Sequence, residues 1–128
     1  MTIDPKIKAL AESTIEDLMA QVKGIRAVVI STEDGFEVAA RVENTAQVSR
    51  LAAIAGSLTA LGAVAVDESQ LGTCDNVIIG AENGCLIMLQ MRGPKIELIL
   101  SVITGKDVIV GQALYFAKQA AQELAQAL

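Results

Sequence analysis

The sequence predicts an α/β protein of the α+β class, in which helices cover both faces of one antiparallel sheet in the order α-β-β-α-β-β-β-α. Two dipeptides, Asp34-Gly35 and Asn83-Gly84, each separate two runs rich in β-branched residues, and such turns join antiparallel neighbours. Residues 25–31 and 96–103 are apolar on both strand faces. A strand of that kind is buried on both sides, so the sheet needs a helical layer on each face.

The first helix is expected to begin at Asp4-Pro5 and to end at Gly24. Aspartate is a favoured N-cap, and proline fits the first helical position because its missing N–H would be unpaired there. Glycine is the usual residue after the last helical turn. Apolar side chains between these limits recur at helical spacing.

The first hairpin joins residues 25–31 to residues 36–42 through Asp34-Gly35. A two-residue type I′ turn at this dipeptide would place Val29 opposite Ala40. Residues 36–42 alternate between apolar and charged side chains, so this second strand is expected at an edge of the sheet.

The second half of the chain continues the pattern. Asn44 is expected to cap a long helix, with Gln47 at the capping-box position, that runs to about Glu68. A type I′ turn at Asn83-Gly84 would place Cys85 opposite Glu82. Asp107 is expected to cap the last helix. The three remaining strands are expected at residues 75–81, 85–91 and 96–103.

Composition excludes several classes of function. The 128 residues, 1–128, suit one domain, and the net charge of −5 argues against a nucleic-acid partner. The chain has no histidine, which rules out Ser–His–Asp and Cys–His catalysis and removes the commonest metal ligand. We expect no catalytic, cofactor-binding or metal-binding residues. No signal peptide is evident, and the uncharged residues 51–66 are too few to span a bilayer, so we expect a cytoplasmic protein without membrane insertion.

Two weaker motifs have structural explanations. Gly105-Lys106-Asp107 is similar to the end of a phosphate-binding loop, but the preceding glycine and the final Ser or Thr are missing, so a strand-to-helix turn is expected. Cys74 and Cys85 are expected to lie too far apart for a disulfide and to be small packing residues.

The central helix is unusual because no charge occurs between Arg50 and Asp67. At 100° per residue, its bulkier side chains share one side, which is expected to pack on the sheet: Val48, Leu51, Ile54, Leu58, Leu61 and Ala65. The opposite side carries small residues, namely Ser49, Ala53, Gly56, Ala60 and Ala63. Small residues let another backbone approach closely. The chain's own loops could cover this side, but they are short, so we expect a second chain there.

The order of elements, the strand Gly-Ile-Arg-Ala-Val-Val-Ile, the Asp34-Gly35 hairpin and the small-residue helix resemble the roadblock family of dynein light chains, from about Lys6 to Leu128. The resemblance implies a three-layer, profilin-like fold with sheet order 2-1-5-4-3. The long helix would lie on one face and the two terminal helices on the other. It also implies a homodimer in which the third strands, with Val77 and Ile79, pair edge to edge and the long helices pack together.

Single-domain bacterial members of this family look like regulators of small Ras-like GTPases. The resemblance therefore implies a non-enzymatic activator or scaffold. GTPase activators often supply an arginine. The four arginines are Arg26, Arg41, Arg50 and Arg92, and the family assigns a catalytic role to none of them. Arg50 is the candidate partner contact. A small-molecule-sensing domain without a GTPase partner is the alternative hypothesis, and a remnant enzyme is the third.

Overall fold

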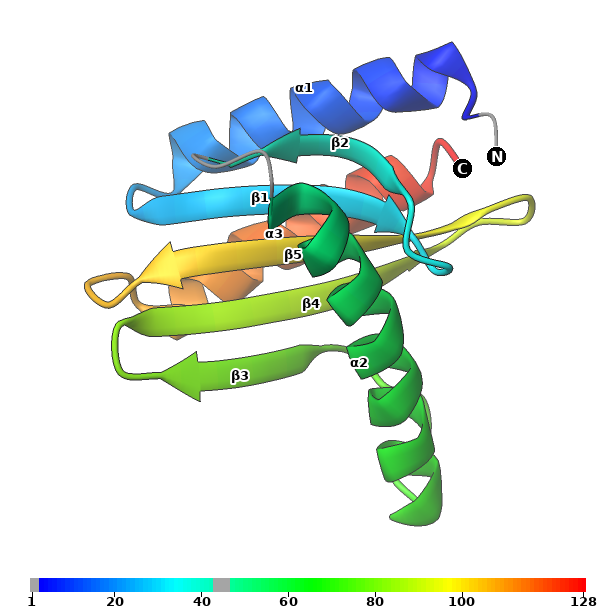
Figure 1. Cartoon of the computed structure of the whole chain (residues 1–128), viewed down its shortest axis with the longest axis vertical. Coiled ribbons are helices and arrows are strands. Elements are labelled where there is room, and N and C mark those ends of the chain that lie inside the picture. Colours follow the sequence, from blue (N-terminus) through cyan, green and yellow to red (C-terminus); the bar gives the residue numbers. More distant parts are fainter. Residues whose placement is uncertain (1–2, 43–46) are drawn as a thin grey trace.

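The predicted order of elements is confirmed in a computed structural model, which describes residues 3–42 and 47–128. The five strands form one antiparallel sheet in the order β2-β1-β5-β4-β3 (Figure 1). The bounds are α1 (Pro5–Gln21), β1 (Ile25–Thr32), β2 (Glu37–Arg41), α2 (Val48–Glu68), β3 (Val77–Ala81), β4 (Gly84–Arg92), β5 (Glu97–Gly105) and α3 (Val110–Ala125). The predicted third strand therefore starts two residues too early.

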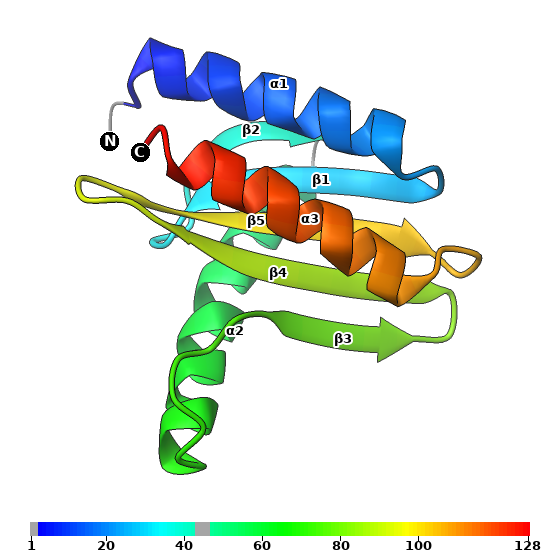
Figure 2. The same cartoon turned by 180° about the vertical axis from the view of Figure 1, so that it is seen from behind.

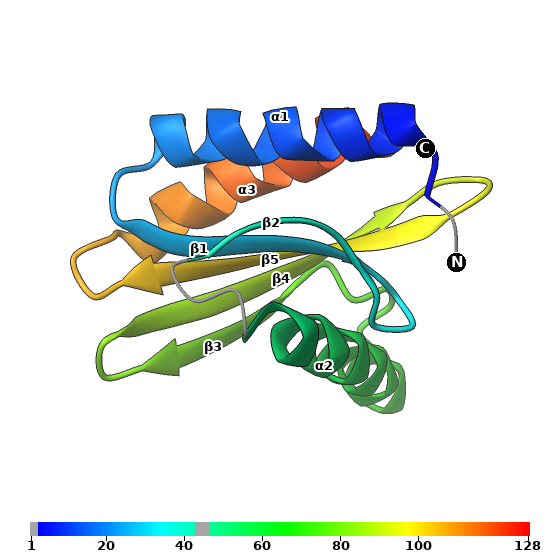
Figure 3. The same ribbon diagram turned by 45° about the horizontal axis from the view of Figure 1, so that its top comes forward.

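The helices form two layers on opposite faces of the sheet, as the sequence predicts. Helices α1 and α3 lie side by side on one face (Figure 2), and α2 lies alone on the other (Figure 3). The main core lies between the sheet and the α1–α3 layer, where Leu18, Ile30 and Leu100 are fully buried. Smaller apolar clusters lie under α2. The two faces are therefore covered unequally.

The first hairpin has the predicted register but a different turn. Val29 lies opposite Ala40, as expected. However, Gly35 has a positive φ of 96° and Asp34 does not, whereas a type I′ turn needs a positive φ at both residues. The prediction of a type I′ turn is therefore wrong. The Thr32 hydroxyl accepts a hydrogen bond from the Phe36 N–H at 3.0 Å, and the Gly35 N–H donates to the Thr32 carbonyl at 3.1 Å. These bonds favour a longer loop, and a register shift next to it restores the predicted pairing.

The second hairpin turns one residue earlier than predicted. Ala81 lies opposite Gly84 and Cys85 lies opposite Gly80, so Glu82 is not the partner of Cys85. Gly84 is the first residue of β4, and a side chain at this position would collide with the Thr104 carbonyl oxygen on β5. The glycine is therefore needed for close strand packing rather than at the centre of the turn.

The helix ends agree with the prediction in part. Asp4 caps α1 and accepts a hydrogen bond from the Lys6 N–H at 2.9 Å. Asn44 lies outside the described residues, and Gln47, which precedes α2, makes no side-chain cap. Asp107 does not cap α3, whose N-cap is Ile109. Residues 105–108 instead form a turn, in which the Val108 N–H donates to the Gly105 carbonyl at 3.3 Å. The Val108 side chain lies against Gly24 in the loop before β1.

Candidate functional site

Strand β3 is an edge strand with an unguarded outer side. Among the described residues it pairs only with β4, and none of its five residues is charged. Ile78 and Ile79 point to opposite faces of the sheet and are 41% and 40% exposed. Unpaired backbone groups next to exposed isoleucines form a template for pairing with another strand. Val77, the other predicted contact on β3, is half-buried against α2.

Helix α2 extends well beyond the sheet (Figure 1). Its buried residues are Val48, Ala52, Ala55 and Thr59, all in the first twelve residues of the helix. The C-terminal half crosses β3 and projects past it, so that Leu61 is 63% exposed and Val64 is 58% exposed. An isolated apolar half-helix of this kind is typical of a surface that packs against protein.

The small-residue side of α2 faces the chain's own β1–β2 turn, which the sequence did not predict. A Cβ atom placed on Gly56 would lie 2.7 Å from the Glu33 carbonyl oxygen. A Cβ atom placed on Gly35 would lie 3.3 Å from the Cα atom of Ala53. Glycine is needed at Gly56 and at Gly35 so that the turn and the helix can approach each other this closely. The chain's own turn therefore occupies the space beside Gly56, whereas Ala53 is exposed, and the assignment of both residues to a contact with a second chain stays a prediction.

The other small residues of α2 are placed differently. Ser49, Ala60 and Ala63 are exposed, and the structure gives them no contact that defines a role. Gly62, which the sequence prediction did not include, lies against β3: a Cβ atom there would be 2.8 Å from the Val77 side chain and 3.5 Å from the Cys74 thiol. Both cysteines are free.

The bulky side of α2 only partly packs on the sheet. Leu51 and Leu58 are half-buried against the sheet, whereas the side chains of Ile54 and Leu61 are 48% and 63% exposed. The prediction that Ile54 and Leu61 pack on the chain's own sheet is therefore wrong. The sheet contacts instead come from Ala52, Ala55 and Thr59, because only short side chains fit where the helix lies closest. We call Leu51, Ile54, Leu58 and Leu61 the apolar flank.

The apolar flank faces an uncovered end of the sheet. Leu51 and Ile54 border a narrow gap with Leu86 of β4 and Ile103 of β5. Beyond that gap lies an open depression of about 380 Å³, mostly apolar. Leu86 and Ile103 line both, so the two features are continuous. The depression is formed by the starts of β1 and β4, the ends of β3 and β5 and the β3–β4 turn, and its residues include Arg26, Ile79, Ala81, Leu86 and Ile103. We call this depression the bare sheet end.

The four arginines lie in different surroundings. Arg41 pairs with Glu16 at 3.5 Å, and Arg92 donates to the Gln90 side chain at 2.7 Å. Arg26 and Arg50 are exposed and form no ion pair with any residue that the structure describes. The four are not gathered in one place, since they lie on β1, β2, α2 and β4.

The described residues offer no clear catalytic or metal centre. No three His, Cys, Asp or Glu side chains among them are grouped to hold a metal ion. Gly105-Lys106-Asp107 forms the predicted strand-to-helix turn, in which the Gly105 N–H donates to the Gly24 carbonyl at 2.9 Å. Next to the β1–β2 turn, a hydrogen bond to Glu97 and the charge of that carboxylate raise the pKa of Glu33.

Helix α2 is also the one helix in the described ranges that is long and apolar enough to cross a bilayer. The core helices of water-soluble proteins can meet the same criterion. Here the N-terminal half of α2 packs on the sheet, so length and composition do not by themselves assign the helix to a membrane.

No protein-family model and no curated protein matches this sequence. Solved structures do match in fold. A Roadblock/LC7 domain from Streptomyces avermitilis aligns with a TM-score of 0.81 and 16% identity over 91% of this chain and 95% of that chain. MglB from Myxococcus xanthus aligns with a TM-score of 0.83 and 13% identity over 99% and 93%. An MglB with a tetrameric arrangement aligns with a TM-score of 0.82 and 15% identity over 98% and 92%. The chain therefore has the roadblock/LC7 fold that its sequence resemblance implied.

Proposed function

We propose that this chain is a homodimeric, non-enzymatic regulator or scaffold for a small Ras-like GTPase. The observation that carries the proposal is one continuous surface: the unguarded β3 edge, the apolar flank of α2 and the bare sheet end. Each part exposes apolar groups that another protein could cover.

The surface is complementary to itself. A two-fold axis beside β3 would pair the two β3 edges antiparallel and extend the sheet across both copies. The projecting half of each α2 would then lie over the bare sheet end of the other copy, because these features occupy opposite ends of β3 on one face (Figure 1). The apolar flanks of the two helices would face each other across the axis.

This arrangement revises which residues would form the interface. Val77 and Ile79 remain at the pairing strand. The helix contacts are assigned to Ile54, Leu58 and Leu61 instead of Ala53 and Gly56, because the latter pair contacts the β1–β2 turn. The revised contact does not depend on Ser49, Ala60 or Ala63, which are exposed and stay predicted contacts. Arg50 remains a candidate contact for a second partner because it is exposed at the start of α2.

The GTPase partner is supported by the fold and by the family resemblance. The chain shares its fold with MglB along nearly its full length. A fold alone does not determine a partner, so the proposal needs a direct test. The absence of histidine from the sequence favours a binding role over general acid–base catalysis.

The first experiment is sedimentation of the pure protein at micromolar concentration, where a dimer is expected and a monomer would contradict the self-association. The second uses a small GTPase encoded beside this gene, loaded with GDP or with a non-hydrolysable GTP analogue. Binding with faster GTP turnover indicates an activator, and binding without faster turnover indicates a scaffold. No binding in either nucleotide state would contradict the GTPase proposal.

The small-molecule-sensing alternative has one favourable observation. The bare sheet end is an apolar depression lined in part by Arg26, which would suit a ligand with an apolar body and a negatively charged group. The proposed dimer would cover that depression with α2 of the second copy. A monomeric protein that binds no GTPase would therefore favour the alternative.

A further inference from the structure

Arg26 lies next to the bare sheet end without an ion-pair partner. It lies on β1 and borders the depression together with Ile103 and Thr104 of β5. Its aliphatic chain leans over the end of β5, where its Cδ atom lies 3.9 Å from a Cβ atom placed on Gly105. Within the described residues, 3–42 and 47–128, the only ion pair is Arg41–Glu16. The charge of Arg26 is therefore available to a partner.

The projecting end of α2 carries the opposite charge. Asp67 and Glu68 end the helix after the long uncharged stretch, and both are exposed. The last turn has no basic residue to offset them. The carbonyl groups at a helix C-terminus add a partial negative charge in the same place. This end of α2 therefore suits a cation such as a guanidinium group.

We propose that Arg26 of one copy pairs with Asp67 and Glu68 of a second copy, so that the pair fixes the orientation of the two copies. The inference rests on the proposed self-association and adds its charged contact. Gly62 lies against Val77 of β3, so the helix from Gly62 to Glu68 extends roughly 9 Å past that strand. The second copy's β4 and β5 would lie roughly 10 and 14 Å from the same strand. The carboxylates would therefore end above β4, and Arg26 reaches over β5 toward them.

One competing contact lies within the same depression. Glu82 lines it as well, but it lies in the β3–β4 turn, with β4 and β5 between it and Arg26 on β1. It forms no ion pair with Arg26. The carboxylates of a second copy would approach from above the sheet, where the apolar flank excludes water and strengthens the attraction.

The test is a charge-reversal cycle read by sedimentation equilibrium of the full chain. Arg26→Glu alone, and Asp67→Lys with Glu68→Lys, should each weaken the dimer about tenfold, because each places like charges together. Combining all three changes should restore the dissociation constant to within about threefold of the original protein. Lys8→Glu on α1, which lies on the other face of the sheet, is the matched charge control and should change nothing.

The outcomes separate the two proposals. A monomeric original protein removes the proposed self-association and this pair with it. A dimer that Arg26→Glu does not weaken, or that the combined variant does not restore, overturns the ion pair and leaves the self-association in place. Circular dichroism of each variant checks that the exposed substitutions leave the fold intact.

Discussion

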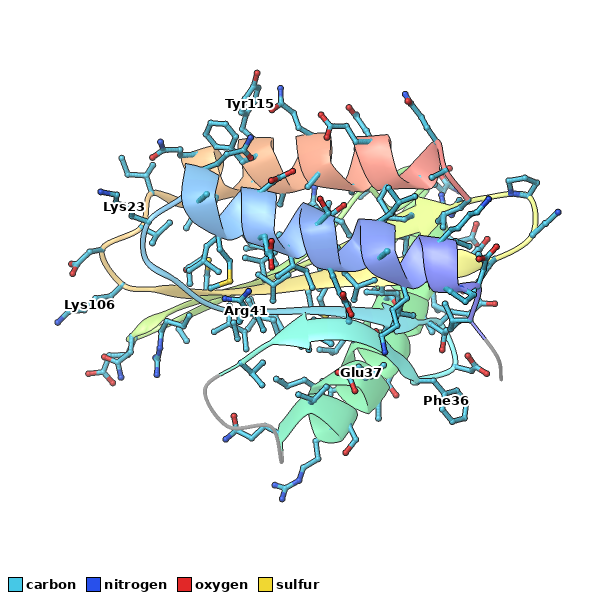
Figure 4. All side chains as sticks on the ribbon, turned by 90° about the horizontal axis from the view of Figure 1, so that it is seen from above. Lys23, Phe36, Glu37, Arg41, Lys106 and Tyr115 are labelled. Atoms are coloured by element: carbon cyan, nitrogen blue, oxygen red, sulfur yellow. The ribbon has the colours of Figure 1, made fainter. Side chains whose placement is uncertain are left out.

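The two outer strands of the sheet have the same length but differ in how their outer sides are protected. Strand β2 begins with Glu37 and ends with Arg41, contains a register shift, and lies beside α1 (Figure 4). Strand β3 has no charged residue, no irregular pairing and no helix along its outer side. Charges and bulges are the usual means by which proteins prevent edge-to-edge association. This difference indicates that β2 is protected against pairing with another strand, whereas β3 is suited to pair with one.

The most direct way to break this comparison is to change the charge at one position on each edge. Ile79→Glu should weaken self-association by at least about 100-fold, because it puts a carboxylate in the apolar centre of the proposed contact. Glu37→Lys on β2 is the matched control and should leave the dissociation constant unchanged. Sedimentation equilibrium measures both. Equal effects at the two edges would show that β3 has no special role.

The second prediction concerns the helix beside β3. Leu61→Glu should weaken self-association by about tenfold or more, because Leu61 is exposed in one copy and would be covered by the other. The thermal unfolding midpoint extrapolated to the monomer should stay the same, since Leu61 makes little contact within its own chain. A lower monomer stability with an unchanged dissociation constant would remove Leu61 from the proposed interface.

The third prediction sharpens the comparison from the β2 side. Gly56→Ala should destabilise the fold by about 1–3 kcal/mol, because the added methyl group would meet the Glu33 carbonyl in the β1–β2 turn. Denaturant unfolding measures this change. Gly111→Ala, which has open space around it in α3, is the control and should not destabilise the protein. If Gly56→Ala mainly dissociates a dimer, the small-residue side of α2 is an interface after all.

The smallest effect is expected from charge in the same turn. Glu33 lies next to Glu97, which raises its pKa, so the folded state favours the protonated carboxyl group. This contribution is present below the ordinary carboxyl pKa and is lost as the pH rises through the raised value. Glu33 is exposed, so water screens its repulsion from Glu97. Glu33→Gln should therefore stabilise the protein at neutral pH by at most about 0.5 kcal/mol, and the gain should shrink toward pH 4. Urea unfolding at both pH values measures it, and a gain that grows on acidification would contradict the prediction.

Much of the fold followed from local chemistry in the sequence. The Asp4-Pro5 helix start, the Val29–Ala40 pairing and the helical layer on each face are all confirmed. The sheet order was implied by the roadblock resemblance and is also confirmed. Turn types were harder to predict, because the Thr32 hydroxyl and the contact between Gly84 and β5 depend on neighbours that local sequence does not specify.

What the sequence determined by itself is the alternation of strands and helices and the presence of one helix too apolar to face water alone. Periodicity gives the angles between side chains on that helix, but it does not give the direction in which the helix is turned. Only the tertiary structure decided that the small side receives the β1–β2 turn and that the apolar flank lies beside the bare sheet end. The physical reason is steric: the turn approaches the helix closely over the small residues Ala53 and Gly56, so the bulky residues are left to cover the sheet or to meet a second protein.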